Sequence, residues 1–184
     1  MKRFAALLII LMLLFTSSAQ AMWMIHHMEG FNCAFPKSAE VEYSNKEAGK
    51  SYVYAYWFPD SDDGAMIAES FIWWGKKFNM TVKEAKRLQK KEKDRFMASR
   101  KKNGEKVDFY YTPEPYKTKM FEQDCIISAT ECSYREGSTD RHNTLYRIYF
   151  GAKGYEIVLM SNSKDALEKL FDSNNFQHSV TWAD

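Results

Sequence analysis

The sequence predicts an α+β fold, in which an antiparallel β-sheet is covered by helices within a single domain. Several segments alternate apolar and polar side chains and are joined by short loops, which is typical of sequential antiparallel strands. Two later segments have a capping residue at the start and apolar residues at helical spacing. No internal repeat or linker divides the 184 residues, so we expect one hydrophobic core.

The first 21 residues are typical of a cleaved signal peptide. Lys2 and Arg3 give a positive start, Phe4 to Phe15 is an unbroken apolar run, and the segment ends in Ala-Gln-Ala. Twelve apolar residues are too few for a membrane-spanning helix, which needs about twenty. We therefore expect residues 22–184 to form the mature domain, in the periplasm or secreted.

Charge is balanced in this mature domain. The chain has 26 basic and 24 acidic residues, and the predicted signal peptide removes Lys2 and Arg3 but no acid, so 24 of each remain. This zero net charge excludes an overall basic nucleic-acid-binding protein and a long disordered acidic protein. The composition after residue 21 also excludes a protein with several membrane-spanning helices.

In the first half of the chain, alternation predicts strands at 31–35, 39–43 and 52–58, before a loop at 59–64. Apolar side chains then recur at helical spacing between residues 67 and 78, so a helix is expected there. A longer helix is expected at 82–102. Its start has the Thr-x-x-Glu pattern of a capping box, and an Asn-Gly pair follows its end.

In the second half, alternation predicts strands at 107–111, 126–134, 146–150, 155–159 and 176–182. Helix is an alternative just upstream of the second of these, around Met120 and Phe121. Ser163 is expected to cap a short helix that ends near residue 171. We expect the helices that follow the third and seventh strands to cover one face of the sheet.

The predicted helix at 82–102 is strongly basic. It contains ten basic and three acidic residues, a charge of +7, and few apolar anchors, so most of it is expected to face water. A solvated face is the simple interpretation. The functional hypothesis is a docking stripe for an anionic partner, such as an acidic protein, phospholipid headgroups or lipopolysaccharide. The residues expected to carry binding are Lys86, Lys90, Lys93 and Lys101.

Three cysteines allow at most one internal disulfide. Cys125 and Cys132 are the nearest pair. On one straight strand they would lie roughly 23 Å apart and face opposite ways, so a bond requires a chain reversal at 126–131. The alternative is Cys33 bonded to one of them across the fold. A buried, inert thiol is the simple interpretation of Cys33.

The start of the mature domain is rich in methionine and histidine. Thioether and imidazole ligands suit copper, so Met24, His26, His27 and Met28 form a candidate metal site. The competing interpretation is an apolar segment that covers the edge of the sheet, in which two histidines happen to be adjacent.

No catalytic motif is present in the sequence, and we assign no catalytic residue and no cofactor. There is no His-Glu-x-x-His, no Gly-x-Ser-x-Gly and no phosphate-binding glycine loop. A hydrolase would have to assemble its site from distant residues, such as His142, Asp140 and a serine. His142 is expected in an exposed turn, and His178 on the apolar face of the last strand.

Four consecutive segments near the C-terminus form a pattern: a hairpin at 144–150 and 154–160, a short helix with an apolar stripe at 163–171, and a last strand that begins at Phe176-Gln177-His178-Ser179. This pattern resembles the close of the PsbP-like superfamily, which includes the exported DcrB-like proteins. The early strand that ends at Pro36 and the central helix also fit, so the similar layout spans residues 31–182. The resemblance implies an accessory or chaperone-like binding domain and supplies no catalytic residue. The cysteines, the loop at 113–115 and the Met/His-rich start depart from the pattern.

These observations predict an exported, non-enzymatic accessory protein of the cell envelope that acts by binding a protein or an anionic envelope component, and not nucleic acid. An immunity protein that neutralises a toxin and a stabiliser of an envelope complex are two specific forms. The alternatives are a small envelope hydrolase and a copper-binding periplasmic protein.

Overall fold

The structure is a computed structural model that describes residues 23–28, 31–47, 50–59, 64–75, 80–150 and 154–182. The predicted signal peptide, residues 1–21, lies outside the described residues. The described chain contains these strands and helices: β1 Trp23–Met28, β2 Phe31–Pro36, β3 Glu40–Glu47, β4 Lys50–Trp57, β5 Ile67–Trp73, α2 Val82–Lys102, β6 Lys106–Tyr111, β7 Tyr116–Met120, β8 Gln123–Glu136, β9 Thr139–Phe150, β10 Tyr155–Ser161, α3 Lys164–Phe171, α4 Asn174–Gln177 and β11 Val180–Trp182.

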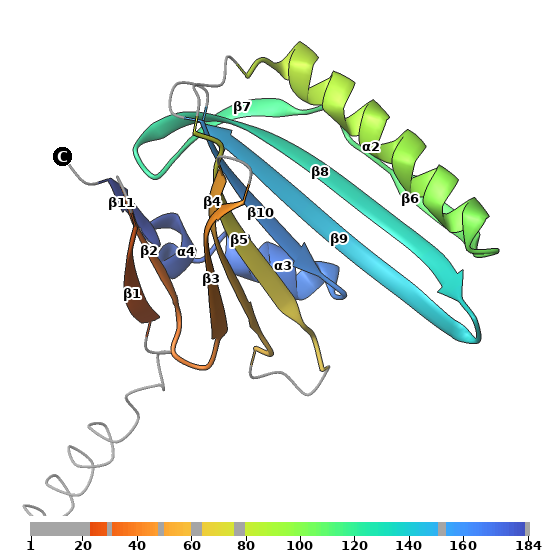
Figure 1. Ribbon diagram of the computed structural model, residues 1–184, viewed down its shortest axis with the longest axis horizontal. Coiled ribbons are helices and arrows are strands. Elements are labelled where there is room, and N and C mark those ends of the chain that lie inside the picture. The colour runs from red at the N-terminus through yellow and green to blue at the C-terminus, as the bar shows by residue number, and fades with distance from the viewer. Residues whose placement is uncertain are drawn as a thin grey trace, which may run out of the picture.

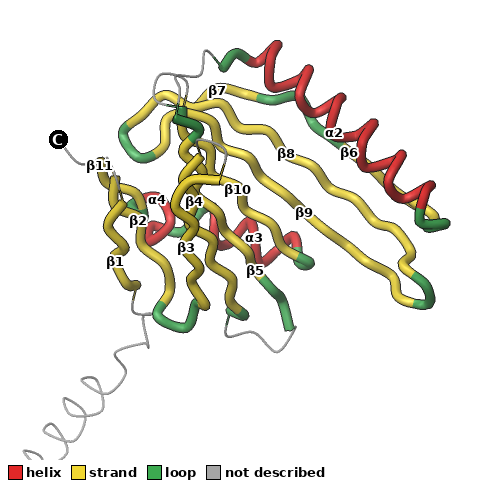
Figure 2. Tube along the Cα trace, viewed as in Figure 1, coloured by secondary structure: helices red, strands yellow, loops and turns green. Residues whose placement is uncertain are grey.

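The strands form two antiparallel sheets (Figures 1 and 2). A three-stranded sheet has the order β1-β2-β11. An eight-stranded sheet has the order β3-β4-β5-β10-β9-β8-β6, and β7 also pairs with β8. The β8–β9 hairpin is the longest ladder, and it pairs Cys125 with Phe150 at one end and Glu136 with Thr139 at the other.

The expected fold class, α+β with helices covering one face of the sheet, is wrong. The described chain is mainly strand, and a second sheet covers the core face of the large one. The two longer helices also lie on opposite faces. Leu167 of α3 packs with Ile127 and Ile148, whereas Ala85 of α2 packs with Ile126 and Tyr149. Because successive strand residues point to opposite faces, these two sets lie on opposite sides of the sheet.

The core lies between the two sheets and is closed by α3 and α4. Its fully buried side chains come from the small sheet, from one face of the large sheet, and from both helices; the largest are Phe35, Phe150, Phe176, Ile67, Ile127, Ile148, Ile157, Leu159 and Leu167. Aromatic rings join the layers. The Phe35 ring lies 5.7 Å from that of Phe71, and the Phe121 ring lies 5.5 Å from that of Phe176.

The error in fold class comes from two segments whose sequence patterns favoured a helix where the chain forms a strand or a turn. The segment expected as a helix at 67–78 forms strand β5 over Ile67–Trp73. A spacing of four fits a helix, but it is also an even spacing, so Ile67 and Phe71 share one strand face and are buried between β4 and β10. Around Met120 and Phe121 the chain forms no helix but the tight turn of the β7–β8 hairpin, in which Phe121 and Glu122 have positive φ angles.

The two ends of the described chain also differ from the prediction. The segment expected as an apolar lead-in contains strand β1, which pairs with β2. The last strand is only β11, and Phe176 lies in the helical turn α4, where it is buried in the core. His178 caps that turn and is exposed, so its expected place on an apolar strand face is wrong.

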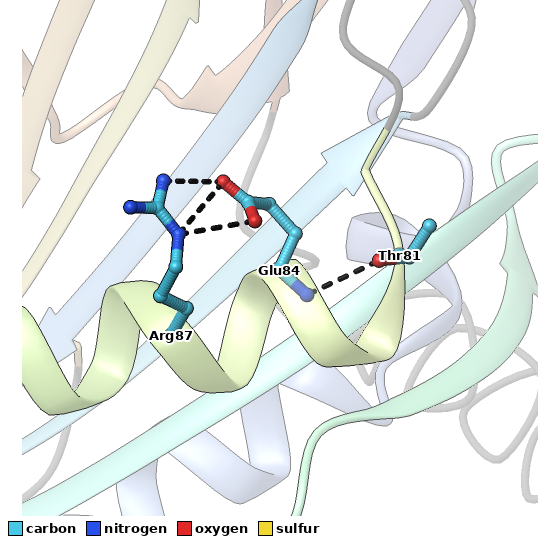
Figure 3. Close-up of polar contacts among 3 residues, drawn as sticks. All are labelled: Thr81, Glu84 and Arg87. Carbon is cyan, nitrogen blue, oxygen red and sulfur yellow. Dashed lines mark hydrogen bonds and ion pairs between the residues drawn. The ribbon is translucent and has the colours of Figure 1, made fainter.

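The helix expected at 82–102 is confirmed as α2, and Figure 3 shows its start. The Thr81 hydroxyl accepts a hydrogen bond from the Glu84 backbone N–H at 3.1 Å. The Glu84 carboxylate accepts from the Arg87 guanidinium, one turn along. This pairing holds the pKa of Glu84 below its usual value. The capping hydroxyl satisfies one of the N–H groups that have no partner inside the helix.

Candidate functional site

The outward face of α2 gathers most of the basic side chains of this segment. Of its ten basic residues, Arg100 alone is half-buried, and the other nine are exposed. The exposed nine are Lys83, Lys86, Arg87, Lys90, Lys91, Lys93, Arg95, Lys101 and Lys102. In Figure 1 the helix runs along one margin of the large sheet, beside β6 and β8.

Two of the four lysines expected to carry binding are already engaged within the fold. The Lys86 ammonium bonds to both carboxylate oxygens of Glu114, at 2.8 and 2.9 Å. The Lys93 ammonium lies 5.6 Å from the centre of the Tyr110 ring. In the part of the chain that the structure describes, Lys90 and Lys101 have neither contact. With about 3.6 residues per turn, Lys83, Lys90 and Lys101 lie along one line on the helix.

We call Lys83, Lys90, Lys91 and Lys101 the outer stripe. No carboxylate among the described residues pairs with any of them. Two of the three acids on the same helix pair elsewhere: Glu84 with Arg87, and Glu92 with Arg147 on the sheet. The third, Asp94, is exposed and forms no ion pair with the stripe among the described residues. The outer stripe is therefore a surface with an excess of positive charge. The sequence shows that this segment has an excess of positive charge, but not which charges are paired. The partners of Lys86 and Glu92 are at least 28 residues away along the chain.

The inner face of α2 is held to the sheet by few apolar contacts and several polar ones. Ala85 is buried against Ile126 and Tyr149. The Gln89 amide donates hydrogen bonds to the backbone oxygens of Pro113 at 3.2 Å and Ala129 at 3.1 Å. These contacts fix the orientation of the helix, so that the same residues always face water.

A buried ionic network supports the helix at its middle. Arg147 on β9 bonds to Glu156 on β10 at 2.5 Å and to Glu92 on α2 at 3.1 Å. Trp74 donates from Nε1 to the other oxygen of Glu156 at 3.0 Å. Burial raises the pKa of Glu92, and the neighbouring Arg147 opposes that shift. The network links four segments of the chain by charge-assisted bonds.

The candidate disulfide between Cys125 and Cys132 is not formed. Both residues lie on the uninterrupted strand β8, so the chain reversal that a bond requires is absent from residues 126–131. All three cysteines are buried and free, and the alternative bond to Cys33 is not formed either. Burial raises the pKa of the Cys125 thiol to about 11 and of the Cys33 thiol to about 12. These thiols are therefore protonated at neutral pH and poor nucleophiles.

The candidate copper ligands lie on β1. Met24 is an exposed residue opposite Phe35, and His26 and His27 have the backbone positions opposite Cys33 and Asn32. The side chains of His26, His27 and Met28 lie outside the described residues. Among the side chains that are described, no group of three or more His, Cys, Asp or Glu residues is placed to hold a metal.

The residues named for a hydrolase come together at the far end of the β8–β9 hairpin. His142 lies on β9, and not in a turn as expected, directly opposite Ser133. Asp140 is two residues from His142 and so shares its face. Asp140 bonds to Arg135 at 2.8 Å, which lowers its pKa. In the described structure no hydrogen bond joins His142 to Asp140 or Ser133, and all three side chains are on the exposed part of the hairpin or only partly buried. The arrangement lacks the linked nucleophile and base of a hydrolase.

No protein-family model matches the chain, and no curated protein matches it. No helix within the described residues combines the length and the apolar character needed to span a membrane. The case for a function therefore rests on the geometry of α2 and the sheet beneath it.

Proposed function

We propose that the protein is an exported, non-enzymatic accessory protein of the cell envelope that binds an acidic protein through the outer stripe of α2. The observation that carries this proposal is the absence of any described carboxylate paired with Lys83, Lys90, Lys91 or Lys101. The remainder of the mature chain is acidic enough to balance the helix, yet its acids are not paired with the stripe. Unpaired charges on a rigid helix create a field that increases the association rate with an oppositely charged surface.

An acidic protein fits this surface better than a lipid membrane. A helix that binds a membrane surface buries an apolar face in the lipid. The apolar residues of α2 instead face the sheet, and Met97 is its one large exposed apolar residue. Exposed Phe109 and Tyr111 on the adjacent strand β6 are also residue types enriched at protein interfaces. The resemblance to PsbP-like proteins is consistent with an accessory role.

The experiment compares two variants that change the charge equally. The test variant changes all four residues of the outer stripe from Lys to Glu. The matched control changes four other exposed lysines, Lys37, Lys117, Lys119 and Lys169, to Glu. A photo-crosslinking amino acid at position 98, beside the stripe on the same exposed face, identifies the partner in cells, and the purified partner is then titrated against each variant.

We expect the crosslinked partner to be an acidic protein and the stripe variant to bind it on the order of tenfold or more weakly. Binding by the unchanged protein should weaken as salt increases, and the control variant should bind like the unchanged protein. Equal losses in both variants would show that only net charge matters. If the unchanged protein binds strongly to vesicles of phosphatidylglycerol and no protein is crosslinked, the partner is a membrane surface and not an acidic protein.

Export is part of the same proposal and has its own test. Expression of the full chain in a bacterium followed by mass measurement of the periplasmic protein should give a chain that begins at Met22. A cytoplasmic product that retains residues 1–21 would contradict export without affecting the outer stripe.

A further inference from the structure

A cleft of about 650 Å³ lies under α2, on the side of the helix opposite the outer stripe. Its walls come from α2, β6, β8, β9 and β10. The volume is within the range of about 300–1,000 Å³ that is usual for small-molecule sites. The cleft is separate from the residues of the outer stripe, none of which lines it.

The wall of this cleft contains four arginines, of which two are engaged in the fold. Arg95, Arg100, Arg141 and Arg147 line the cleft together with Glu92 and Glu136. Arg100 pairs with Glu105 at 2.6 Å and Arg147 pairs with Glu156, so Arg95 and Arg141 are the arginines available to an anion. Arg95 is exposed and has no ion pair in the described structure. Arg141 pairs with Glu136 at 2.9 Å, but both side chains are about half exposed. Such a pair is weak, so Arg141 can exchange Glu136 for another anion.

Aromatic rings form the apolar part of the same wall. The Phe96 ring lies 5.2 Å from the Tyr110 ring and 5.6 Å from the Tyr134 ring, and it is inclined to them by 45° and 77°. The Arg100 guanidinium lies 4.0 Å from the centre of the Tyr134 ring and 5.1 Å from that of Phe96. An apolar group can pack against such rings, with its charged group near the arginines.

Two hydrogen-bond donors in the wall have no acceptor. The Nε atoms of Arg100 and Arg147 are shielded from solvent and unpaired, and they are the only unpaired donors among the buried side-chain atoms that the structure describes. An unsatisfied buried donor is destabilising, and it points to an acceptor that is part of the functional state. Their terminal nitrogens already bond to carboxylates, Arg100 to Glu105 and Arg147 to Glu156 and Glu92, so these two arginines form the fixed base of the cleft.

We propose that this cleft binds a small organic anion, in which a carboxylate or phosphate is attached to an apolar body. The anionic group is met by Arg95 and Arg141, and the apolar body packs on Phe96, Tyr110 and Tyr134. This site is independent of the outer stripe and of its protein partner.

The test uses two fluorescent probes that differ by one charge. Anilinonaphthalene sulfonate is an aromatic anion, and N-phenylnaphthylamine is the same body without the sulfonate. The mature protein should bind the anionic probe at one saturable site and the neutral probe at least tenfold more weakly, since a hydrogen bond to a charged group is worth about that factor. Inorganic phosphate should compete with the anionic probe.

Variants locate the site. Arg95→Gln with Arg141→Gln should weaken the anionic probe about tenfold or more, whereas Arg87→Gln with Arg135→Gln, two exposed arginines outside the cleft, should not. Lys90→Glu with Lys101→Glu should leave probe binding intact even if it abolishes partner binding, which separates this proposal from the previous one. Equal binding of both probes, or no effect of the cleft variants in a protein with unchanged circular dichroism, would overturn it.

Discussion

The two faces of the eight-stranded sheet differ in chemistry, although every strand contributes to both. The face toward the small sheet carries fully buried apolar side chains such as Ile157 and Leu159. The face toward α2 carries Arg147 and Glu156, the aromatic wall and the cleft. On β10 the change occurs between neighbours, since Leu159 is in the core and Met160 lines the cleft.

The core face therefore stabilises the fold, and the face toward α2 contains the groups that we propose bind a ligand. Burial of apolar area on one face stabilises the fold, because the free energy gained is roughly proportional to the area removed from water. The other face is covered by a helix in which only Ala85 and Gln89 are buried; Val82 and Leu88 are partly buried, and hydrogen bonds and ion pairs make up much of the rest of its contact with the sheet. Polar contacts give defined positions to charged groups more than they give stability.

The largest effect is expected from the ionic network on the α2 face. Arg147→Met leaves the Glu156 side chain, which is 3% exposed, without its counter-charge. Loss of one partner of a buried ion pair costs about 3–5 kcal/mol in the free energy of unfolding. Urea unfolding measures this loss. As a control, Arg141→Met breaks an exposed pair and should cost less than about 1 kcal/mol. Equal effects of the two variants would show that the network is no more buried than the surface pair.

On the core face a cavity should cost almost as much. Leu159→Ala removes a fully buried side chain and should lower the free energy of unfolding by about 2–5 kcal/mol. Met160→Ala, one residue along and on the other face, is half-buried and should cost clearly less. Chemical denaturation of both variants tests the contrast between the faces. A larger loss for Met160→Ala would reverse the assignment of the core face.

The mainly apolar core face contains one buried carboxyl group. Glu69 on β5 is fully buried and neither carboxyl oxygen has a hydrogen-bond partner. Burial raises its pKa well above the usual 4.5. Between the unfolded-state and folded-state pKa values the unfolded chain binds fewer protons, so stability is lost as pH rises through that range.

Glu69→Met should therefore raise the free energy of unfolding at neutral pH by about 1–3 kcal/mol, the cost of an unsatisfied buried polar group. The gain should shrink as the pH falls toward 4.5, where the unfolded carboxyl is also protonated. Glu69→Gln is the control, because it removes the pH dependence and keeps the unsatisfied polar group. Thermal unfolding at several pH values measures both. A gain independent of pH in Glu69→Met would contradict a raised pKa.

The smallest effect is expected at the start of α2. Thr81→Ala removes the hydroxyl that accepts from the Glu84 N–H and should cost about 1 kcal/mol. Thr81→Ser keeps the hydroxyl and should restore most of the loss. Hydrogen exchange of the first-turn amides should increase in the alanine variant alone. If exchange is unchanged, contacts with the sheet hold this end of the helix without the cap.

Local patterns in the sequence predicted the elements whose signals are also local. Thr81 and Ser163 cap helices as expected, and β9 and β10 pair with each other as the predicted hairpin requires. The even spacing of Ile67 and Phe71 misled the prediction, because it fits one face of a helix and one face of a strand alike. The pairing of β5 between β4 and β10 decided between them.

For the two proposed binding surfaces, the sequence by itself determined that residues 82–102 form a helix with an excess charge of +7. Only the tertiary structure decided which of its charges remain unpaired. Glu114 engages Lys86, and Arg147 from β9 engages Glu92, across separations in the chain that no local pattern encodes. The cleft has the same origin, since Arg95 and Arg141 lie on different elements and meet only because α2 packs over the β8–β9 hairpin. Caps and alternation depend on neighbours within a few residues, whereas ion pairs and clefts depend on which distant segments fold against each other.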